Sequence, residues 1–186
     1  FMFFEVWNRA SVHGDIALAS SADGLSWHYE QVVLDEPFHL SYPHTFLHDG
    51  TYYMVPETHG QKQVRLYEAA AFPLVWRLGA VLLNGVDAID ATPFRHNERW
   101  YMLVSVGDNS NLHLYTSGCL QSGWKRHPRS PICTDCGHSA RPAGPVASFA
   151  LSPNLGTSII VGMPATYTAA NPTVGANTLT DLDQSH

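Results

Sequence analysis

The sequence predicts an all-β fold, an incomplete β-propeller built from four-stranded antiparallel blades. The first observation is a repeat with a period of about 48 residues: residues 42–57 read YPHTFLHDGTYYMVPE, and residues 90–105 read DATPFRHNERWYMLVS. The second is that each repeat holds four short apolar–polar alternations, which are typical of strands. The third is that no helical periodicity runs through the chain, whose 14 Gly and 12 Pro are scattered. Four-stranded units repeated at this spacing indicate propeller blades.

The most regular repeat, from Tyr42 to Leu83, predicts one complete blade. Its first two strands are expected to pair as a hairpin across Asp49-Gly50, because this dipeptide favours tight turns between strands. Gly60 and Pro73 mark the later gaps. The four strands are expected at residues 43–48, 51–57, 63–69 and 76–83.

The other repeats are placed by their alignment with this one. The third copy is complete, because Phe94 and Trp124 repeat Phe46 and Trp76. The first copy begins at its second strand, and the fourth loses the pattern after Val146. A propeller region is therefore expected at residues 1–146, with blades at about 1–35, 42–83, 90–127 and 138–146, followed by an atypical low-charge segment at 147–186.

Two complete and two partial blades do not close a ring. Closure is how propellers remove unpaired strand edges, so the sequence predicts that two chains associate as a homodimer in which partial blades complete one another. A stacked solenoid or a β-sandwich is the alternative architecture.

The composition restricts the partners. The net charge is -6, and there is no basic run, which argues against a nucleic-acid surface. No apolar run approaches the roughly 20 residues that span a bilayer, so a soluble chain is expected, with no indication of its location. An acidic cleft suits a carbohydrate or another small-molecule substrate, or a cation.

The cysteines leave three readings open. Cys119, Cys133 and Cys136 are an odd number, which does not indicate a disulfide framework. Cys133 and Cys136, followed by His138, have the spacing of a zinc site, but a structural zinc site requires further ligands. A local disulfide and unreacted thiols are the alternatives.

The blade motifs resemble a known superfamily. An inner strand ending in Phe, then His-Asp-Gly-x-Tyr-Tyr-Met, then a Leu-Tyr strand with a Ser-x-Asp-Gly-x-x-Trp or Phe-Pro-x-x-Trp turn, is similar to the five-bladed propellers of arabinanases, xylosidases and invertases. The segments FFEVWN, LDEPFHLSYPHTFLHDGTYYMVPET and SARPAGP resemble more specifically the propeller domain of glucosamine inositolphosphorylceramide transferases and their bacterial relatives. The resemblance covers roughly residues 1–146 and concerns architecture more than activity.

The resemblance implies a carboxylate site at the mouth of the propeller channel. In the glycosidases, carboxylates there act as base, acid and modulator of the acid's pKa. Asp90 matches the modulator at the start of an inner strand, and Glu57 is placed as a general acid on the neighbouring blade. Glu5 holds the place of Glu57 in the first copy. The base comes from the first inner strand, which lies before Phe1, so the resemblance implies a weak, altered or absent activity.

The carboxylates and histidines can be interpreted in two ways. Glycoside hydrolysis needs two carboxyl groups roughly 5 to 9.5 Å apart, which Glu5, Glu57 and Asp90 are expected to supply near the axis. Alternatively, the glutamates accept hydrogen bonds within their blades. His44 and His138 are candidate ligands of a divalent metal, zinc or calcium, which would activate water on phosphate or other esters. His48 and His96 are expected to cap turns instead.

Three further residues are candidates for substrate binding. Arg141, which directly precedes Pro142, is expected to bind a carboxylate or phosphate, or else to pair with Asp90 or Glu57. Trp7 and Trp100 are expected to stack on a sugar ring. The repeated tryptophans are expected to pack within blades: Trp27, Trp76 and Trp124.

Three functions follow from these patterns. The first is a hydrolase with its site at the channel mouth, glycoside hydrolase-like or metal-assisted on esters. The second is a carbohydrate-binding propeller without turnover. The third is a fragment that only self-associates.

Overall fold

The computed structural model describes residues 1–107, 110–134, 142, 146–152, 156–161 and 177–179. The described strands form four antiparallel sheets, and the only helical turn in these residues is the short 3₁₀ helix η1 (His59–Gln61). None of the helical structure in this part of the chain is long and apolar enough to cross a membrane.

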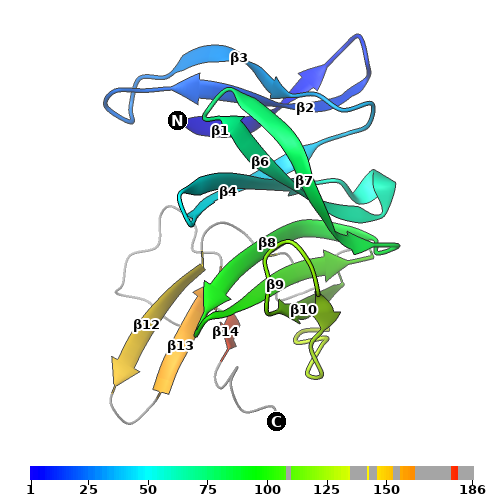
Figure 1. Cartoon of the computed structure of the whole chain (residues 1–186), viewed down its shortest axis with the longest axis vertical. Helices are drawn as coiled ribbons and strands as arrows, with labels where there is room; N and C mark the ends of the chain where they lie inside the picture. The colour runs from blue at the N-terminus through cyan, green and yellow to red at the C-terminus, as the bar shows by residue number, and fades with distance from the viewer. Residues whose placement is uncertain (108–109, 135–141, 143–145, 153–155, 162–176, 180–186) are drawn as a thin grey trace.

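The sheets follow the predicted repeat (Figure 1). The first sheet contains β1 (Met2–Asn8), β2 (His13–Ser20) and β3 (His28–Leu34). The second contains β4 (Ser41–His48), β5 (Thr51–Glu57), β6 (Gln63–Ala71) and β7 (Val75–Asn84). The third contains β8 (Ala88–His96), β9 (Arg99–Val106), β10 (Asn111–Ser117) and β11 (Lys125–Arg126). The fourth contains β12 (Val146–Ser152), β13 (Gly156–Val161) and β14 (Asn177–Leu179).

Each sheet is a meander, in which strands that are consecutive in the chain pair side by side. The prediction of four-stranded antiparallel blades is confirmed, and the first sheet has three described strands. In the fourth sheet, strands continue beyond residue 146, and the boundary that the composition suggests at this residue stays a prediction.

The hairpin at Asp49-Gly50 forms as the sequence predicts. Both residues have positive φ, 46° and 77°, which is the backbone twist that a two-residue turn needs between right-twisted strands. Asn97 and Glu98 have φ of 45° and 63° in the next blade, so the same turn recurs there with a less favourable residue at its second position.

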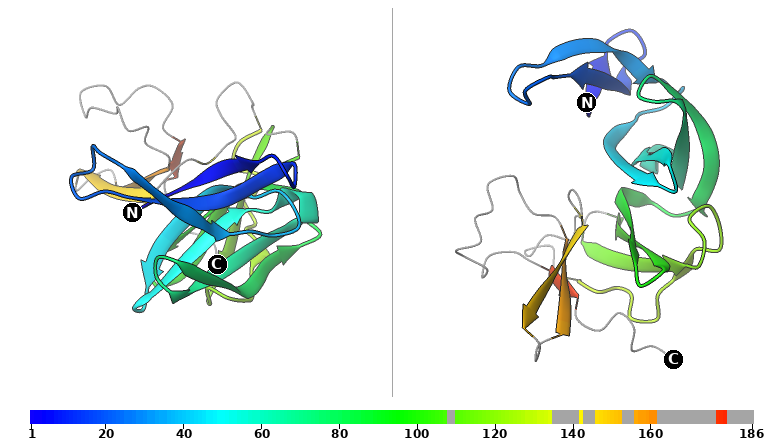
Figure 2. Two further views of the ribbon diagram at one scale, coloured as in Figure 1. Left: turned by 90° about the horizontal axis from the view of Figure 1, so that it is seen from above. Right: turned by 60° about the vertical axis from the view of Figure 1, so that its left-hand side comes forward.

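The core lies between neighbouring blades, and strand alternation explains how. In β5, Tyr53 and Val55 belong to the apolar cluster shared with the third sheet, whereas Met54 belongs to the cluster shared with the first sheet. The centre of β5 is therefore buried on both faces of the second sheet, which explains its nearly continuous apolar sequence. Figure 2 shows the first three sheets following one another along an arc.

The repeated tryptophans have different surroundings. Trp76 is 8% exposed and packs edge-on against Phe3 of the first sheet, and Trp124 packs against the core between the second and third sheets. Trp27, which directly precedes β3, is 43% exposed. Trp76 and Trp124 therefore pack as predicted, although partly against the neighbouring sheet, whereas the prediction of packing is wrong for Trp27, which lies in the connection before β3.

Candidate functional site

The structure brings Glu57 and Asp90 together where the second and third sheets meet. Glu57 ends β5, and alternation from Tyr53 and Val55 turns its side chain toward the third sheet. Asp90 is the third residue of β8 and is 3% exposed. Its backbone N–H donates to Glu57 Oε2 at 3.3 Å, and the two carboxyl groups also share a hydrogen bond.

Both inner strands carry a bulge that directs these groups. The pairing of β4 with β5 shifts between Ser41 and His44, and that of β8 with β9 shifts between Ile89 and Thr92. Tyr42 and Asp90, which occupy the same place in the repeat, have left-handed φ of 44° and 52°.

Left-handed backbone is unfavourable for a residue with a Cβ, and bulges of this kind re-aim side chains beside functional sites. Nothing in the residue types at these positions indicated them, so sequence reasoning missed this device.

Burial and a neighbouring charge perturb Glu57. Its removal from water raises the pKa of its carboxyl group, and the negative charge of Asp90 raises it further. The Asp90 N–H and the charge of His59 oppose this rise only in part. Glu57 therefore holds a proton at a higher pH than an ordinary glutamate does.

Hydroxyl groups extend the pair along the inner strands. The Tyr42 hydroxyl lies 3.0 Å from Thr92 Oγ1, which donates to the Asp90 carbonyl at 3.1 Å. These contacts fix the bulged segment that carries Asp90, so the position of the carboxyl pair is set by residues from both blades.

His44 lies beside this network as a neutral side chain. Its ring stands between those of Tyr42 and Phe46, and burial lowers its pKa. Its Nε2 donates to the Pro93 carbonyl at 3.3 Å, since a carbonyl can only accept. Only Nδ1 is left for a ligand, and the role of His44 in binding a metal stays a prediction.

Glu5 and Trp7 lie together on β1, in a separate group. Glu5 Oε1 is 3.7 Å from Nε2 of His39, and the Trp7 ring is 6.2 Å from the same imidazole. Trp7 is 59% exposed, so its ring is accessible to a ligand. The structure thus gives Glu5 a histidine partner from the segment before β4, and the catalytic role of Glu5 stays a prediction.

Trp100 is largely buried, and its role in sugar binding stays a prediction. Only 5% of Trp100 is exposed, and its ring packs against Phe46 and His48 in the core between the second and third sheets. The physical reason is its position in β9, where alternation places it on the same face as Met102 and Val104.

Three predicted residues lie outside the described part of the chain: Cys136, His138 and Arg141. Their proposed roles in metal or anion binding stay predictions.

Sequence reasoning also missed two histidine–aspartate groups at loops on the Glu57 end of the strands. His59 Nδ1 contacts Asp87 Oδ1, joining η1 to the loop before β8. In the first sheet His13, Asp15 and Asp35 come together, and these are the one group among the described residues whose donor atoms cluster as metal ligands do. Each group contains residues that are 20 or more positions apart in the sequence, so no local sequence motif predicts either group.

A cavity of about 290 Å³ lies at the opposite end of the strands. It opens beside the β4–β5 hairpin, while Glu57 is at the far end of β5, about 20 Å away along an extended strand. It therefore does not belong to the carboxyl site. Its lining residues are His48, Asp49, Tyr53, Arg95, Glu98, Trp100, Gly118, Cys119, Leu120 and Gln121.

Known solved structures share this architecture. A thermostable family-43 glycoside hydrolase aligns with 86% of this chain and 60% of its own, with a TM-score of 0.66 and 16% identity. A family 117 glycoside hydrolase of Zobellia galactanivorans aligns with 84% of this chain and 57% of its own, with a TM-score of 0.56 and 15% identity. At these identities the likeness concerns the fold, and it confirms the predicted resemblance to propeller glycosidases.

Sequence comparison identifies nearer relatives. Glucosamine inositolphosphorylceramide transferase 1 of Oryza sativa subsp. japonica is 34% identical over 139 residues, which are 71% of this chain and 18% of that protein. The Arabidopsis thaliana protein of the same name matches with the same identity and coverage. The chain thus spans less than a fifth of the length of these curated relatives. Residues 1–181 match the family described as glucosamine inositolphosphorylceramide transferase 1, N-terminal. The chain belongs to this N-terminal family.

Proposed function

We propose that the chain processes a carbohydrate at the mouth of the propeller arc, as a glycoside hydrolase-like domain in which Glu57 is the proton donor. The observation that carries this proposal is the contact between Glu57 and Asp90, which, with burial, raises the pKa of Glu57. A general acid must keep its proton at the operating pH and then release it to the leaving oxygen, and a raised carboxyl pKa meets this need.

The two carboxyl groups divide this task. Glu57 donates its proton to the glycosidic oxygen, while Asp90 favours the protonated form of Glu57 before the reaction. The backbone N–H of Asp90 then stabilises the Glu57 carboxylate that remains. Carboxyl groups in direct contact are closer than the roughly 5 to 9.5 Å that a water or a sugar ring requires between acid and base or nucleophile. The pair therefore supplies the acid half of the reaction only.

The test is hydrolysis of a panel of aryl glycosides by the chain and its variants. Glu57→Gln is isosteric and cannot donate the proton, so kcat is expected to fall about 10²- to 10⁴-fold, with a smaller change in KM. Asp90→Asn removes a charge that raises the pKa of Glu57, so it is expected to move the alkaline limb of the pH–rate profile to lower pH. Glu30→Gln, which changes an exposed glutamate of the first sheet, is the matched control. Equal activity of wild type and Glu57→Gln would contradict the proposal.

A second candidate function is sugar binding without turnover. It is favoured by the direct contact of the two carboxyl groups, which are too close together to serve as the acid and base of a glycosidase. The relatives are named glucosamine inositolphosphorylceramide transferase 1, and glucosamine carries an ammonium group that a carboxyl pair can bind. Such a domain would hold the amino sugar and leave the reaction to other parts of a longer protein.

Calorimetry with glucosamine and glucose separates the two functions. A binding site predicts that glucosamine binds more tightly than glucose and more tightly as rising pH ionises Glu57. Glu57→Gln is expected to remove that preference. Glucosamine affinity without turnover of any aryl glycoside would support binding alone, whereas equal affinity for the two sugars would contradict it.

A further inference from the structure

The first sheet holds a compact group of polar side chains that neither proposed function uses. His13 begins β2, Asp15 is two residues further along the strand, and Asp35 directly follows β3. One donor atom from each lies within 4.8 Å of the other two. The group thus joins the start of β2 to the end of β3.

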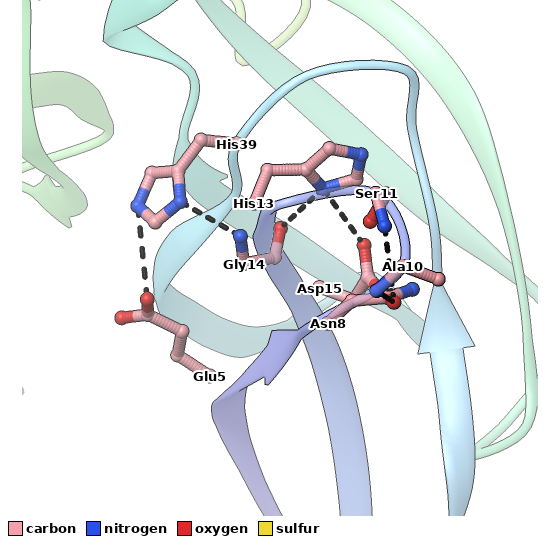
Figure 3. A network of polar contacts seen from close by, with 8 residues as sticks. All are labelled: Glu5, Asn8, Ala10, Ser11, His13, Gly14, Asp15 and His39. Carbon is pink, nitrogen blue, oxygen red and sulfur yellow. Dashed lines mark hydrogen bonds and ion pairs between the residues drawn. The ribbon is translucent and has the colours of Figure 1, made fainter.

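Asp15 is the central observation. The residue is 1% exposed, and its two carboxylate oxygens have different surroundings. Oδ2 accepts a hydrogen bond from Asn8 Nδ2 at 2.9 Å, whereas Oδ1 is buried and accepts no hydrogen bond. The dashed line to Oδ1 in Figure 3 is its ion-pair contact with His13. A buried carboxylate oxygen without a donor is unfavourable unless a charge faces it.

Asn8 holds the carboxylate in this orientation. Its side-chain Oδ1 accepts hydrogen bonds from the backbone N–H groups of Ala10 and Ser11, at 3.0 and 3.4 Å, which fix the amide in the turn between β1 and β2. The amide then presents Nδ2 to Asp15 Oδ2. An outer residue that orients one carboxylate oxygen and leaves the other toward a cluster of donors is typical of a metal site.

His13 stands beside the unsatisfied oxygen at a ligand-like distance. Its Nδ1 lies 3.2 Å from Asp15 Oδ1 and 3.3 Å from the Gly14 carbonyl (Figure 3). With metal–ligand bonds of about 2.0 to 2.2 Å, two atoms bound to one ion lie about 3 to 3.4 Å apart. The Gly14 carbonyl can only accept a hydrogen bond, so binding of an ion by Nδ1 requires the tautomer that carries its proton on Nε2 and replaces the contact with this carbonyl.

We infer that His13, Asp15 and Asp35 bind one divalent cation of the zinc or manganese class. Two carboxylates neutralise the charge of the ion, and the imidazole nitrogen disfavours calcium and magnesium, which prefer oxygen ligands. Asp35 is exposed, so the remaining positions of the ion are open to water or to a ligand. The inference does not depend on the role of Glu57.

The same side chains have a simpler explanation, in which His13 Nδ1 donates its proton to the Gly14 carbonyl and only lies beside Asp15 Oδ1. That reading accounts for the short distance but gives Asp15 Oδ1 no hydrogen bond. It also predicts no affinity for metal, so the two readings differ in a direct measurement.

The experiment is titration of the chelator-treated full chain with Zn²⁺ and Mn²⁺ by calorimetry, with metal content measured after dialysis. One equivalent is expected per chain, together with a rise in Tm. Mn²⁺ is included because thiolates bind it weakly. Zinc that binds to Cys133 or Cys136 therefore has no counterpart in the Mn²⁺ titration and can be told apart from zinc at the proposed site. Wild-type protein that binds neither ion would overturn the inference.

The variants identify the ligands. Asp35→Asn changes an exposed side chain, so the fold is retained, and a loss of affinity of at least about tenfold is expected. Asn8→Ala removes only the orienting hydrogen bond and is expected to weaken binding about 10- to 100-fold. Asp49→Asn is the matched control, because Asp49 Oδ2 forms a similar 3.2 Å pair with His48 but is exposed and has no third ligand. Equal affinities of Asp35→Asn and Asp49→Asn would also overturn the inference.

Discussion

Glu57 lies between a buried sheet face and a second carboxyl group, and both neighbours act on its proton. Its pKa is raised because burial disfavours the charged form and because Asp90 repels a second negative charge. The raised pKa also affects stability, because a group that binds its proton more tightly in the folded state makes the free energy of unfolding depend on pH.

The sign of this dependence is definite. Because the pKa of Glu57 is raised on folding, its contribution to the free energy of unfolding is greatest below the ordinary value of 4.5 and declines as pH rises toward the raised value. Glu57→Gln carries no charge at any pH, so this decline should disappear. Urea unfolding at several pH values between 4 and 8 measures it. A variant whose pH dependence matches that of wild type would show that the carboxyl is not perturbed.

At the scale of elements, Gly14 marks the point where β2 passes the segment before β4. A Cβ there would lie 2.5 Å from the Leu40 carbonyl oxygen and 2.8 Å from atoms of Glu5 and His39. The Leu40 backbone cannot easily retreat, because its N–H donates to the Gly14 carbonyl at 2.8 Å. The close contact between the first and second sheets therefore requires glycine at position 14.

Gly14→Ala is expected to lower the free energy of unfolding by about 1–3 kcal/mol, the usual cost of overpacking. Gly60→Ala in η1 is the matched control, since a Cβ there meets no atom within 4 Å. Chemical denaturation of the two variants gives the comparison. Equal stabilities would mean that the Leu40 segment moves away without cost.

The repeated tryptophans allow a second comparison between elements. Trp76 is 8% exposed and donates from Nε1 to the Pro73 carbonyl at 3.0 Å, whereas Trp27 is 43% exposed. Trp76→Ala is expected to cost about 3–5 kcal/mol, because it leaves a large cavity between two sheets. Trp27→Ala should cost clearly less. Thermal unfolding of both variants checks this, and similar losses would argue that Trp27 is covered in solution.

At the scale of the whole molecule, the arc of blades leaves apolar side chains on the first sheet accessible. Tyr29 is 53% exposed and Trp27 43%. Such surfaces indicate association, and the predicted homodimer is one way to cover them. This expectation stays a prediction, because only one chain is described.

We expect light scattering to give a mass near twice 20.5 kDa. Tyr29→Lys should shift the mass toward the monomer, because a charge on the sheet face opposes its burial. Leu25→Lys is the control, since Leu25 is 87% exposed in a turn. A wild-type chain that stays monomeric at high concentration would contradict the expectation.

The repeat predicted much of the fold. Pairs such as Tyr53 and Tyr101, or Trp76 and Trp124, keep the same spacing because each blade is the same local unit, and local units are encoded by alternation and turn residues. The sequence predicted the packing between blades less well. Trp100 was expected to be accessible because it lies outside the repeated tryptophans, but the neighbouring sheet buries it.

The sequence by itself determined the β-meanders, their period and the presence of carboxylates near the strand ends, because strand patterns and hairpin turns depend on residues close in the chain. Only the tertiary structure decided which side chains meet. The bulges at Tyr42 and Asp90 aim one carboxyl at Glu57, and loops more than 20 residues apart bring His13 and Asp15 to Asp35. Such contacts depend on how whole sheets pack against one another, and no short stretch of sequence records that arrangement.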